Sequence, residues 1–382
     1  MSRRLAAGVL VGLALVLAGC TAAPQRAPKV VQPTVDPPRR TPAVKTALWK
    51  FSFQRSEPLV SGDAGPLLYD GRYYARPDPE NPLVATILDT RTGKVVVRHQ
   101  VPRRTGGWQV EDVFLTGGYA IVVDADAEPP YSPEPWYAVT RYRLSDGKAT
   151  TVATRPPVST VDPEVVAGDG RYAYVTDQGG RGCVAVADVR QDTASVRYCA
   201  PAGWLPGFLR TGDTGLTFAE NSEQPAQSRQ PTGCRRLVRL PTAGAAAEVP
   251  AASACRQYAG AGSGAWSAWT DASDADSDVE HAPVLAAVGT TRSLRVDVGV
   301  TGSLRTCGGW VYYNHRADPT TVEIRRWRPG SDVEVIYRSP GEQLSATTSV
   351  ACADGWLSFM RQDTGTGAGH TDLLAAQLPA AT

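Results

Sequence analysis

The stretch Tyr69-Asp70-Gly71-Arg72-Tyr73-Tyr74 decides the fold, because it joins a turn glycine to an aromatic strand and recurs along the chain. Six further segments share this pattern, at 115–121, 168–174, 212–218, 262–266, 307–312 and 353–357. Their last glycines are Gly71, Gly118, Gly170, Gly215, Gly264, Gly309 and Gly355, spaced by 47, 52, 45, 49, 45 and 46 residues. A period in the forties with several short strands per unit is typical of four-stranded propeller blades. We therefore expect an all-β chain that forms a seven-bladed β-propeller.

Each repeat also contains a second turn signal further along. It is clearest in Asp89-Thr90-Arg91-Thr92-Gly93-Lys94, in Ser145-Asp146-Gly147-Lys148 and in Pro329-Gly330-Ser331. Asp-Gly and Thr-Gly pairs supply the positive φ that a tight hairpin requires. We expect the first glycine turn to join the innermost strand of a blade to its second strand. The second turn then joins the two outer strands.

The Asp-x-x-Thr-Gly-Lys hairpin and the Asp-Gly-Arg-Tyr hairpin resemble repeats of the PQQ-like, YVTN and TolB-like family of bacterial propellers. The resemblance covers about Ala47 to Pro379, and its motifs are structural turns that indicate the fold rather than an activity. In that family, quinoprotein dehydrogenases add a tryptophan near the outer strand and an adjacent pair of cysteines. The segments 95–97 and 150–152 have no such tryptophan, and no vicinal cysteine pair exists. The cofactor PQQ is therefore not expected.

The last repeat is one strand short, because the chain ends soon after a strand expected at 371–378. The segment Thr46–Phe53 alternates in the manner of a strand and precedes the first blade. We expect this N-terminal strand to close the last blade, which removes an open sheet edge.

The N-terminus carries an export signal. Arg3 and Arg4 precede an uncharged apolar run, and Leu17-Ala18-Gly19-Cys20 resembles the lipobox of a bacterial lipoprotein of actinobacterial type. The run is shorter than the roughly 20 residues that span a bilayer. The alternative is an ordinary secretory signal that ends near Ala22-Ala23.

This resemblance implies a signal peptide at 1–19, a lipidated (palmitate-bearing) Cys20 with a proline-rich tether over 20–45, and a propeller over 46–382. It also implies that the lipid holds the protein on the outer face of the cytoplasmic membrane. The formal net charge is +1 for the whole chain and falls to −1 when Arg3 and Arg4 are removed. Such a balance gives no support to nucleic-acid binding.

Six cysteines remain once Cys20 is assigned to lipid: Cys183, Cys199, Cys234, Cys255, Cys307 and Cys352. An even number outside the cytoplasm favours disulfides, and six cysteines allow 15 pairings. Cys183 and Cys199 bracket one expected hairpin turn and Cys234 and Cys255 bracket another, which leaves Cys307 with Cys352. A metal site is the alternative, but no CxxC or HxxxH spacing supports it.

The loops that join second and third strands are long and acidic. In propellers, the functional site usually lies on the face that carries these loops. The candidate ligand face is Asp78, Asp126, Trp136, Asp177, His315, Asp318, Asp363 and His370. Such a surface suits a cation, a sugar or a basic peptide. The alternative is that these loops are solvated and serve solubility.

We expect His99, in an outer-strand region, to be a surface polar residue.

The densest acidic segment alternates carboxylates at Asp274, Asp276, Asp278 and Glu280. Oxygen ligands at every second residue resemble the first half of a calcium loop. The segment has no glycine at the sixth position and no glutamate at the twelfth, which excludes an EF-hand. Calcium is thus a weak candidate, and no other cofactor is expected.

Motifs of the common hydrolase and nucleotide-binding classes are absent, including GxSxG, HExxH and the P-loop. We favour a non-catalytic lipoprotein that binds or scaffolds a protein or cell-envelope ligand, although whether it is an enzyme stays open. The alternative is a propeller enzyme that acts on polysaccharide, a glycosidase or a lyase, since paired carboxylates suffice for that chemistry. An enzyme predicts carboxylates that converge at the central channel, whereas a binding protein predicts a broad face with dispersed charges.

Overall fold

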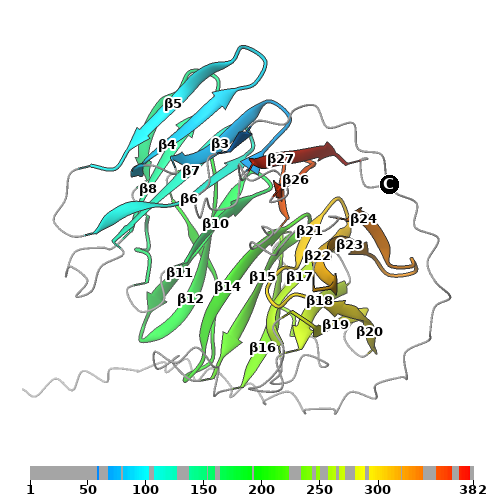
Figure 1. Cartoon of the computed structure of the whole chain (residues 1–382). Helices are drawn as coiled ribbons and strands as arrows, with labels where there is room; N and C mark the ends of the chain where they lie inside the picture. The colour runs from blue at the N-terminus through cyan, green and yellow to red at the C-terminus, as the bar shows by residue number, and fades with distance from the viewer. Residues whose placement is uncertain are drawn as a thin grey trace, which may run out of the picture. The chain divides into compact units, whose positions relative to one another are not determined.

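A computed structural model describes residues 58–59, 68–78, 81–102, 107–126, 137–152, 154–159, 164–191, 193–222, 234–242, 247–249, 257–263, 266–271, 280–288, 292–319, 321–338, 350–363 and 370–378. These residues form seven antiparallel sheets joined by turns, and they contain no helix (Figure 1). Within them, accordingly, no helix is long and apolar enough to cross a membrane. The sheets are the blades of a seven-bladed β-propeller, as the repeat predicts.

The first four blades follow the chain in order. Blade 1 holds β2 (Leu68–Tyr69), β3 (Tyr73–Asp78), β4 (Asn81–Asp89) and β5 (Lys94–Gln100). Blade 2 holds β6 (Trp108–Thr116), β7 (Tyr119–Asp126), β8 (Tyr137–Arg143) and β9 (Lys148–Val152). Blade 3 holds β10 (Val165–Gly168), β11 (Arg171–Gln178), β12 (Arg181–Asp188) and β13 (Ser195–Cys199). Blade 4 holds β14 (Leu205–Gly212), β15 (Gly215–Asn221) and β16 (Arg235–Pro241).

The remaining blades complete the propeller. Blade 5 holds β17 (Gln257–Ser263), β18 (Trp266–Asp271), β19 (Ala282–Val288) and β20 (Arg292–Gly299). Blade 6 holds β21 (Arg305–Cys307), β22 (Trp310–Asp318), β23 (Thr321–Trp327) and β24 (Glu334–Arg338). Blade 7 holds β25 (Ala351–Ala353), β26 (Trp356–Asp363), β27 (His370–Gln377) and the N-terminal β1 (Pro58–Leu59).

The described repeat glycines lie at the turns between the first and second strands of a blade, as the sequence predicts, and Gly215 is itself the first residue of β15. Gly118, Gly170, Gly309 and Gly355 adopt φ between 67° and 79°, which is the left-handed region that favours glycine. Gly264 lies outside the described residues. The glycines of the second turn signal, Gly93, Gly147 and Gly330, also have positive φ and join third to fourth strands.

The N-terminal side of the chain closes blade 7, as expected. β1 pairs antiparallel with β27, with Pro58 opposite Asp372 and Leu59 opposite Thr371. The segment proposed for this role, Thr46–Phe53, lies outside the described residues, as do the expected signal peptide and tether over 1–45. The pairing that the structure describes is therefore later in the chain than the expected one.

Two of the expected disulfides are present. Cys183 and Cys199 face each other across β12 and β13 with a Cα–Cα distance of 4.0 Å. Cys307 on β21 bonds Cys352 on β25, with a Cα–Cα distance of 5.8 Å, and so joins blade 6 to blade 7. Cys234 is also disulfide-bonded, while Cys255 lies outside the described residues.

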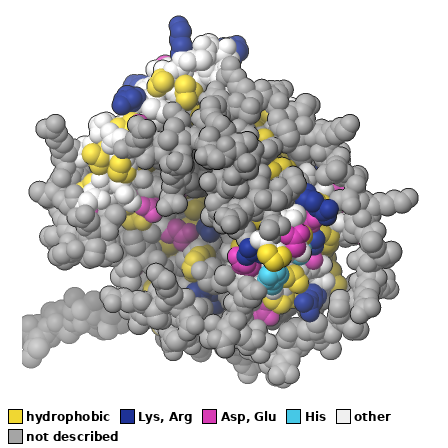
Figure 2. Space-filling model, in the orientation of Figure 1, with side chains coloured by type: hydrophobic (Ala, Val, Ile, Leu, Met, Phe, Trp, Pro, Cys, Tyr) yellow, Lys and Arg dark blue, Asp and Glu magenta, His cyan; other side chains and the backbone are white. Residues whose placement is uncertain are grey.

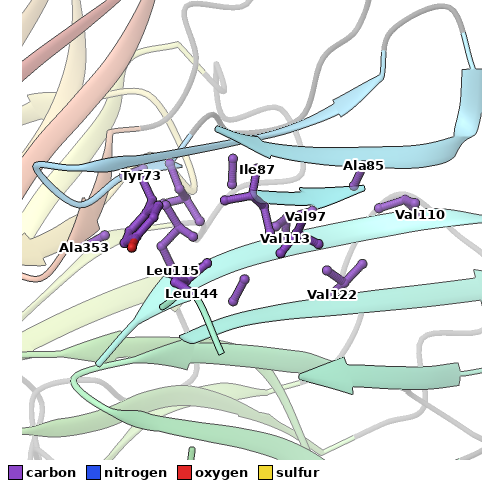
Figure 3. Packing of buried hydrophobic residues seen from close by; sticks show 14 of the residues in the cluster. Tyr73, Ala85, Ile87, Val97, Val110, Val113, Leu115, Val122, Leu144 and Ala353 are labelled. Carbon is purple, nitrogen blue, oxygen red and sulfur yellow. The ribbon is translucent and has the colours of Figure 1, made fainter. Parts of the chain in front are cut away.

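The core consists of apolar layers between neighbouring blades rather than one central cluster. On β7, Val122 packs into the layer that contains Ile87 of blade 1. Its neighbours Ile121 and Val123 pack into the layer that contains Tyr174 of blade 3. Successive residues of a strand point to opposite faces, so each blade is buried on both sides. Figure 3 shows the layer between blades 1 and 2, with Ile87, Val97, Val113 and Val122.

Candidate functional site

The blades present two different ends. At one end lie the tight glycine turns that join first to second and third to fourth strands, and we call it the turn end. At the other end the second strand connects to the third, and we call it the loop end. The antiparallel order of every sheet puts all connections of one kind at the same end.

Three predicted ligand-face residues lie at the loop end of separate blades. Asp78 pairs with Asn81 in blade 1, Asp177 with Gly182 in blade 3, and Asp318 with Thr321 in blade 6. Asp177 and Asp318 are exposed, and Asp78 is half-buried. The loop end therefore carries carboxylates from several blades, distributed rather than gathered in one pocket.

Asp126 lies at the same end but differs in environment. Its side chain is buried at 6% exposure, and its Oδ1 accepts a hydrogen bond from the backbone N–H of Gly107 at 3.0 Å. Asp126 thus holds the chain where it enters blade 2, since Gly107 directly precedes β6. We assign it to this local anchoring rather than to an open ligand surface.

Four ligand-face residues remain: Asp363, His370, His315 and Trp136. Asp363 and His370 face each other in the register of β26 and β27 at the loop end of blade 7. Nδ1 of His315 lies 2.8 Å from the carbonyl oxygen of Val298, and burial lowers the pKa of this imidazole. Trp136 lies outside the described residues.

The acidic segment proposed for calcium is described only at its end. Asp274, Asp276 and Asp278 lie outside the described residues. The carboxylate of Glu280 forms an ion pair with the guanidinium of Arg316. No group of three histidine, cysteine, aspartate or glutamate side chains in the described part of the chain is placed to hold a metal ion.

A second group of charged residues lies at the innermost strands around the central axis. We name Asp112, Glu164, Arg210 and Arg305 the channel cluster. Asp112 lies on β6, Glu164 directly precedes β10, and Arg210 and Arg305 lie on β14 and β21. β14 contacts both β10 and β21, so residues from non-neighbouring blades approach one another here.

The strand registers give the depth of each residue. Arg210 pairs with Thr217 and Arg305 with Tyr312, each two residues from the last pair at the turn end. Asp112 pairs with Val123, four residues from the last pair at the turn end. At about 3.4 Å per residue, the arginine Cα atoms lie about 7 Å nearer the turn end than that of Asp112. Nη1 of Arg210 nevertheless lies 3.5 Å from Oε1 of Glu164, so this guanidinium extends towards the acidic level.

Two residues of the channel cluster have shifted pKa values. Burial and the charge of Glu111 raise the pKa of Asp112 to about 7. Burial and the charge of Arg210 lower the pKa of Arg305 to about 9. Both shifts penalise the charged form, because the desolvation of each group is not offset by a strong partner. Perturbed groups of this kind in a channel are candidates for ligand binding or catalysis.

The channel cluster was not among the residues predicted from the sequence. Its members lie four to six residues before the repeat glycines: Asp112 before Gly118, Glu164 before Gly170, Arg210 before Gly215, and Arg305 before Gly309. Charged residues at this offset in otherwise apolar innermost strands are a signal that could have identified them.

Hydrogen bonds cross the centre at the turn end. The backbone N–H of Gly117 in blade 2 donates to the carboxylate of Asp354 in blade 7, with the shorter distance 3.1 Å. The carboxylate of Asp213 in blade 4 accepts from the N–H groups of Gly308 and Gly309 in blade 6, at 3.0 and 2.6 Å. Each contact passes over an intervening blade, so these hydrogen bonds narrow the turn end of the channel.

The expectation that His99 is a surface polar residue is wrong. His99 on β5 is buried at 3% exposure between blades 1 and 2. Its Nε2 lies 2.8 Å from Oδ1 of Asp124 on β7, and its Nδ1 lies 2.8 Å from the hydroxyl of Tyr142 on β8. An outer strand faces solvent only along its edge, while its faces are covered by the neighbouring blades.

Blade 6 contains an ionic network around the buried carboxylate of Glu323 near the loop end. Glu323 pairs with Arg325 and Arg338, and Arg325 also pairs with Asp297 of blade 5 at 2.8 Å. Burial raises the pKa of Glu323, but its hydrogen bonds to the two arginines outweigh this effect and lower it. On the face shown in Figure 2, acidic and basic side chains likewise lie next to one another.

Comparisons with known proteins support the fold of this chain but give no information about its activity. No protein-family model and no curated protein matches the sequence. Among solved structures, one from a study of two prolyl endopeptidases matches with a TM-score of 0.51 and 11% identity, over 82% of this chain and 50% of that chain. The chain thus spans about half the length of that match.

Two further matches have lower TM-scores. The β-propeller domain of the Trilobed protease from Pyrococcus furiosus matches with a TM-score of 0.49 and 11% identity, over 84% of this chain and 96% of that chain. TolB from Acinetobacter baumannii matches with a TM-score of 0.38 and 11% identity, over 82% of this chain and 80% of that chain. Identities this low carry no information about activity.

Proposed function

We propose that the protein is a lipid-anchored, extracytoplasmic binding propeller that presents its loop end to a protein or cell-envelope partner. The observation that carries this proposal is the distribution of exposed carboxylates at the loop ends of separate blades. Asp177 belongs to blade 3 and Asp318 to blade 6, and both are exposed. Dispersed charge over a broad face suits recognition of a large partner better than chemistry on a small substrate.

The partner that such a face favours is a protein or peptide with basic side chains. Rim charges act mainly by steering the encounter, so the association rate depends on ionic strength. The experiment is cross-linking at the cell surface followed by binding kinetics with the captured partner. The test variants are Asp177→Asn and Asp318→Asn. Asp332→Asn is the matched control, because Asp332 is also exposed but lies in the third-to-fourth turn of blade 6 at the turn end.

We expect the double loop-end variant to slow association about 3- to 10-fold at low salt, since rim charges change the on-rate more than the off-rate. The control variant should bind as the parent chain does. Equal association rates for all three proteins would show that another surface carries the interaction.

The anchor is a separate part of the proposal. It rests on the similarity of Leu17-Ala18-Gly19-Cys20 to a lipobox and on the proline-rich segment after it. Cys20→Ser should release the protein from the membrane fraction and abolish incorporation of labelled palmitate. A retained, unlabelled protein would instead support another mode of attachment.

The channel cluster favours a second candidate function, an enzyme that acts on polysaccharide. The pKa of Asp112 is raised to about 7, a value that suits a general acid near neutral pH. Incubation with a panel of acidic and neutral polysaccharides tests this candidate. Product formation that Asp112→Asn abolishes, with an unchanged circular dichroism spectrum, would favour the enzyme over the binding protein.

A further inference from the structure

The two arginines of the channel cluster are close enough to repel each other. Arg210 on β14 and Arg305 on β21 belong to blades 4 and 6, and these innermost strands contact each other. Each arginine lies two residues from the last strand pair at the turn end, so their Cα atoms are at the same depth along the strands. Two guanidinium groups brought together in a confined space require negative charge nearby.

Glu164 and Asp112 supply only part of that charge, because the pKa of Arg305 is lowered to about 9 by burial and by Arg210 despite these two carboxylates. Nη1 of Arg305 donates to the carbonyl oxygens of Gly302 and Leu304 at 3.0 and 2.7 Å, and within the described residues Arg305 has no ion pair. These neutral acceptors fix the position of the guanidinium without neutralising it. Arg305 is therefore held in place with donor capacity left over.

Arg210 is only partly compensated. Its Nη1 donates to the carbonyl oxygen of Leu209 at 2.7 Å and lies 3.5 Å from Oε1 of Glu164. Its Nε is buried and has no hydrogen-bond partner among the described residues. A buried guanidinium N–H without an acceptor is costly, and a ligand oxygen would satisfy it.

Access to the arginines is favoured from the loop end. At the turn end, Asp354 reaches across to Gly117 and Asp213 reaches across to Gly308 and Gly309. A ligand at the guanidinium of Arg210 lies next to Glu164, whose Oε1 is 3.5 Å from Nη1 of Arg210, and near Asp112, which interacts electrostatically with both arginines. These two carboxylates would oppose a dianion more strongly than a monoanion.

We propose that the central channel binds the carboxylate group of a small ligand between the guanidinium groups of Arg210 and Arg305. A carboxylate carries one charge and two oxygens, which match the planar donor fork of arginine. A phosphate ester would place more negative charge beside Asp112 and Glu164. This site is separate from the exposed carboxylates of the loop end.

The test is isothermal titration calorimetry of the chain produced without lipid modification. The probes are D-glucuronate, for sugar acids, and N-acetylglycine, for peptide-like carboxylates. D-glucose and N-acetylglycine amide are their neutral counterparts, and inorganic phosphate tests the preference for a monoanion. Each probe is titrated to about 10 mM, which detects binding free energies of a few kcal/mol.

We expect one or both carboxylates to bind and neither neutral counterpart to do so. Arg210→Gln and Arg305→Gln should each weaken binding about 10- to 100-fold, as removal of a charged hydrogen-bond donor does. The matched control is Arg98→Gln, because Arg98 is exposed on the outer strand β5 and should leave binding unchanged. Melting temperatures of all variants establish that they are folded.

Three results would overturn the proposal: no binding of either carboxylate, equal binding by Arg305→Gln and the parent chain, or tighter binding of phosphate. The proposal that the loop end binds a partner is tested separately, by association kinetics with the Asp177→Asn and Asp318→Asn variants. Failure of one proposal therefore leaves the other intact.

Discussion

Nε2 of His99 lies 2.8 Å from Oδ1 of Asp124, and this contact joins the outer strand of blade 1 to the second strand of blade 2. Both side chains are almost completely buried, at 4% and 1% exposure. The hydroxyl of Tyr142 completes the arrangement on the other side of the imidazole. A polar triad in an apolar layer specifies how the two blades pack, because every member needs its partners.

We predict that Asp124→Ala lowers the free energy of unfolding by about 2 to 4 kcal/mol, since it leaves the buried imidazole without its partner. Thermal and urea denaturation measure the change. Asp332→Ala is the control, because Asp332 is exposed and should change stability by about 0.5 kcal/mol or less. An equal melting temperature for Asp124→Ala and the parent chain would contradict the assigned role.

The two described disulfides should differ in their contribution to stability. Cys307–Cys352 closes a separation of 45 residues and Cys183–Cys199 one of 16. A longer loop restricts the unfolded chain more, and the chain-entropy relation gives a difference of about 1 kcal/mol. We compare the two double cysteine-to-alanine variants by urea denaturation. The Cys307/Cys352 variant should be the less stable, and the reverse order would show that native contacts dominate.

Stability should depend on pH through Asp112, whose pKa is raised from 3.8 to about 7 in the folded protein. Between these values the unfolded chain loses the proton while the folded chain keeps it, so stability falls as pH rises from about 4 to 7. Above pH 7 the penalty is constant. Asp112→Asn removes it and should stabilise the protein by about 1 to 3 kcal/mol at pH 8 but little at pH 4. A gain that is equal at both pH values would exclude this linkage.

Glu323 should show the opposite dependence. Its buried carboxylate has a lowered pKa because the pairs with Arg325 and Arg338 outweigh the effect of burial. The stability that it contributes is present above its unfolded pKa, near 4.5, and is lost as pH falls through the folded value. We expect Glu323→Gln to cost about 3 kcal/mol at pH 7 and less at pH 3, measured by denaturation at both values. A cost that grows on acidification would contradict the assignment.

The turn of blade 1 should tolerate no side chain at Gly71. A Cβ there would lie 2.6 Å from Cε2 of Trp356, and the residue has φ of 97°. Gly71→Ala should therefore cost more than the roughly 1 kcal/mol expected from backbone conformation alone. Gly93→Ala is the control, because Gly93 also has positive φ but open space around it. Equal melting temperatures for the two variants would show that Trp356 moves aside freely.

Much of the fold could be predicted from the sequence because its signals are local. The glycine turns recur with a period of 45 to 52 residues, and each turn glycine that the structure describes lies at the junction of the two expected strands. Cys183 and Cys199 follow from the same logic, since they flank one hairpin. The end of the blades at which Asp78, Asp177 and Asp318 lie also follows, because antiparallel order alone decides it.

The sequence by itself thus determined the number of blades, their turns, the closure of blade 7 by an N-terminal strand, though not the residues of that strand, and the pairing of neighbouring cysteines. The tertiary structure alone decided which charged residues meet. Consecutive members of the channel cluster (Asp112, Glu164, Arg210 and Arg305) are 46 to 95 residues apart in the sequence, yet the closed arrangement of blades brings them to one channel. Burial decided the rest, because Asp126 and His99 look like surface residues until a neighbouring blade or a backbone N–H covers them. A sequence repeat reflects the contacts within one blade, whereas the contacts between blades depend on how the whole chain closes into a ring of blades.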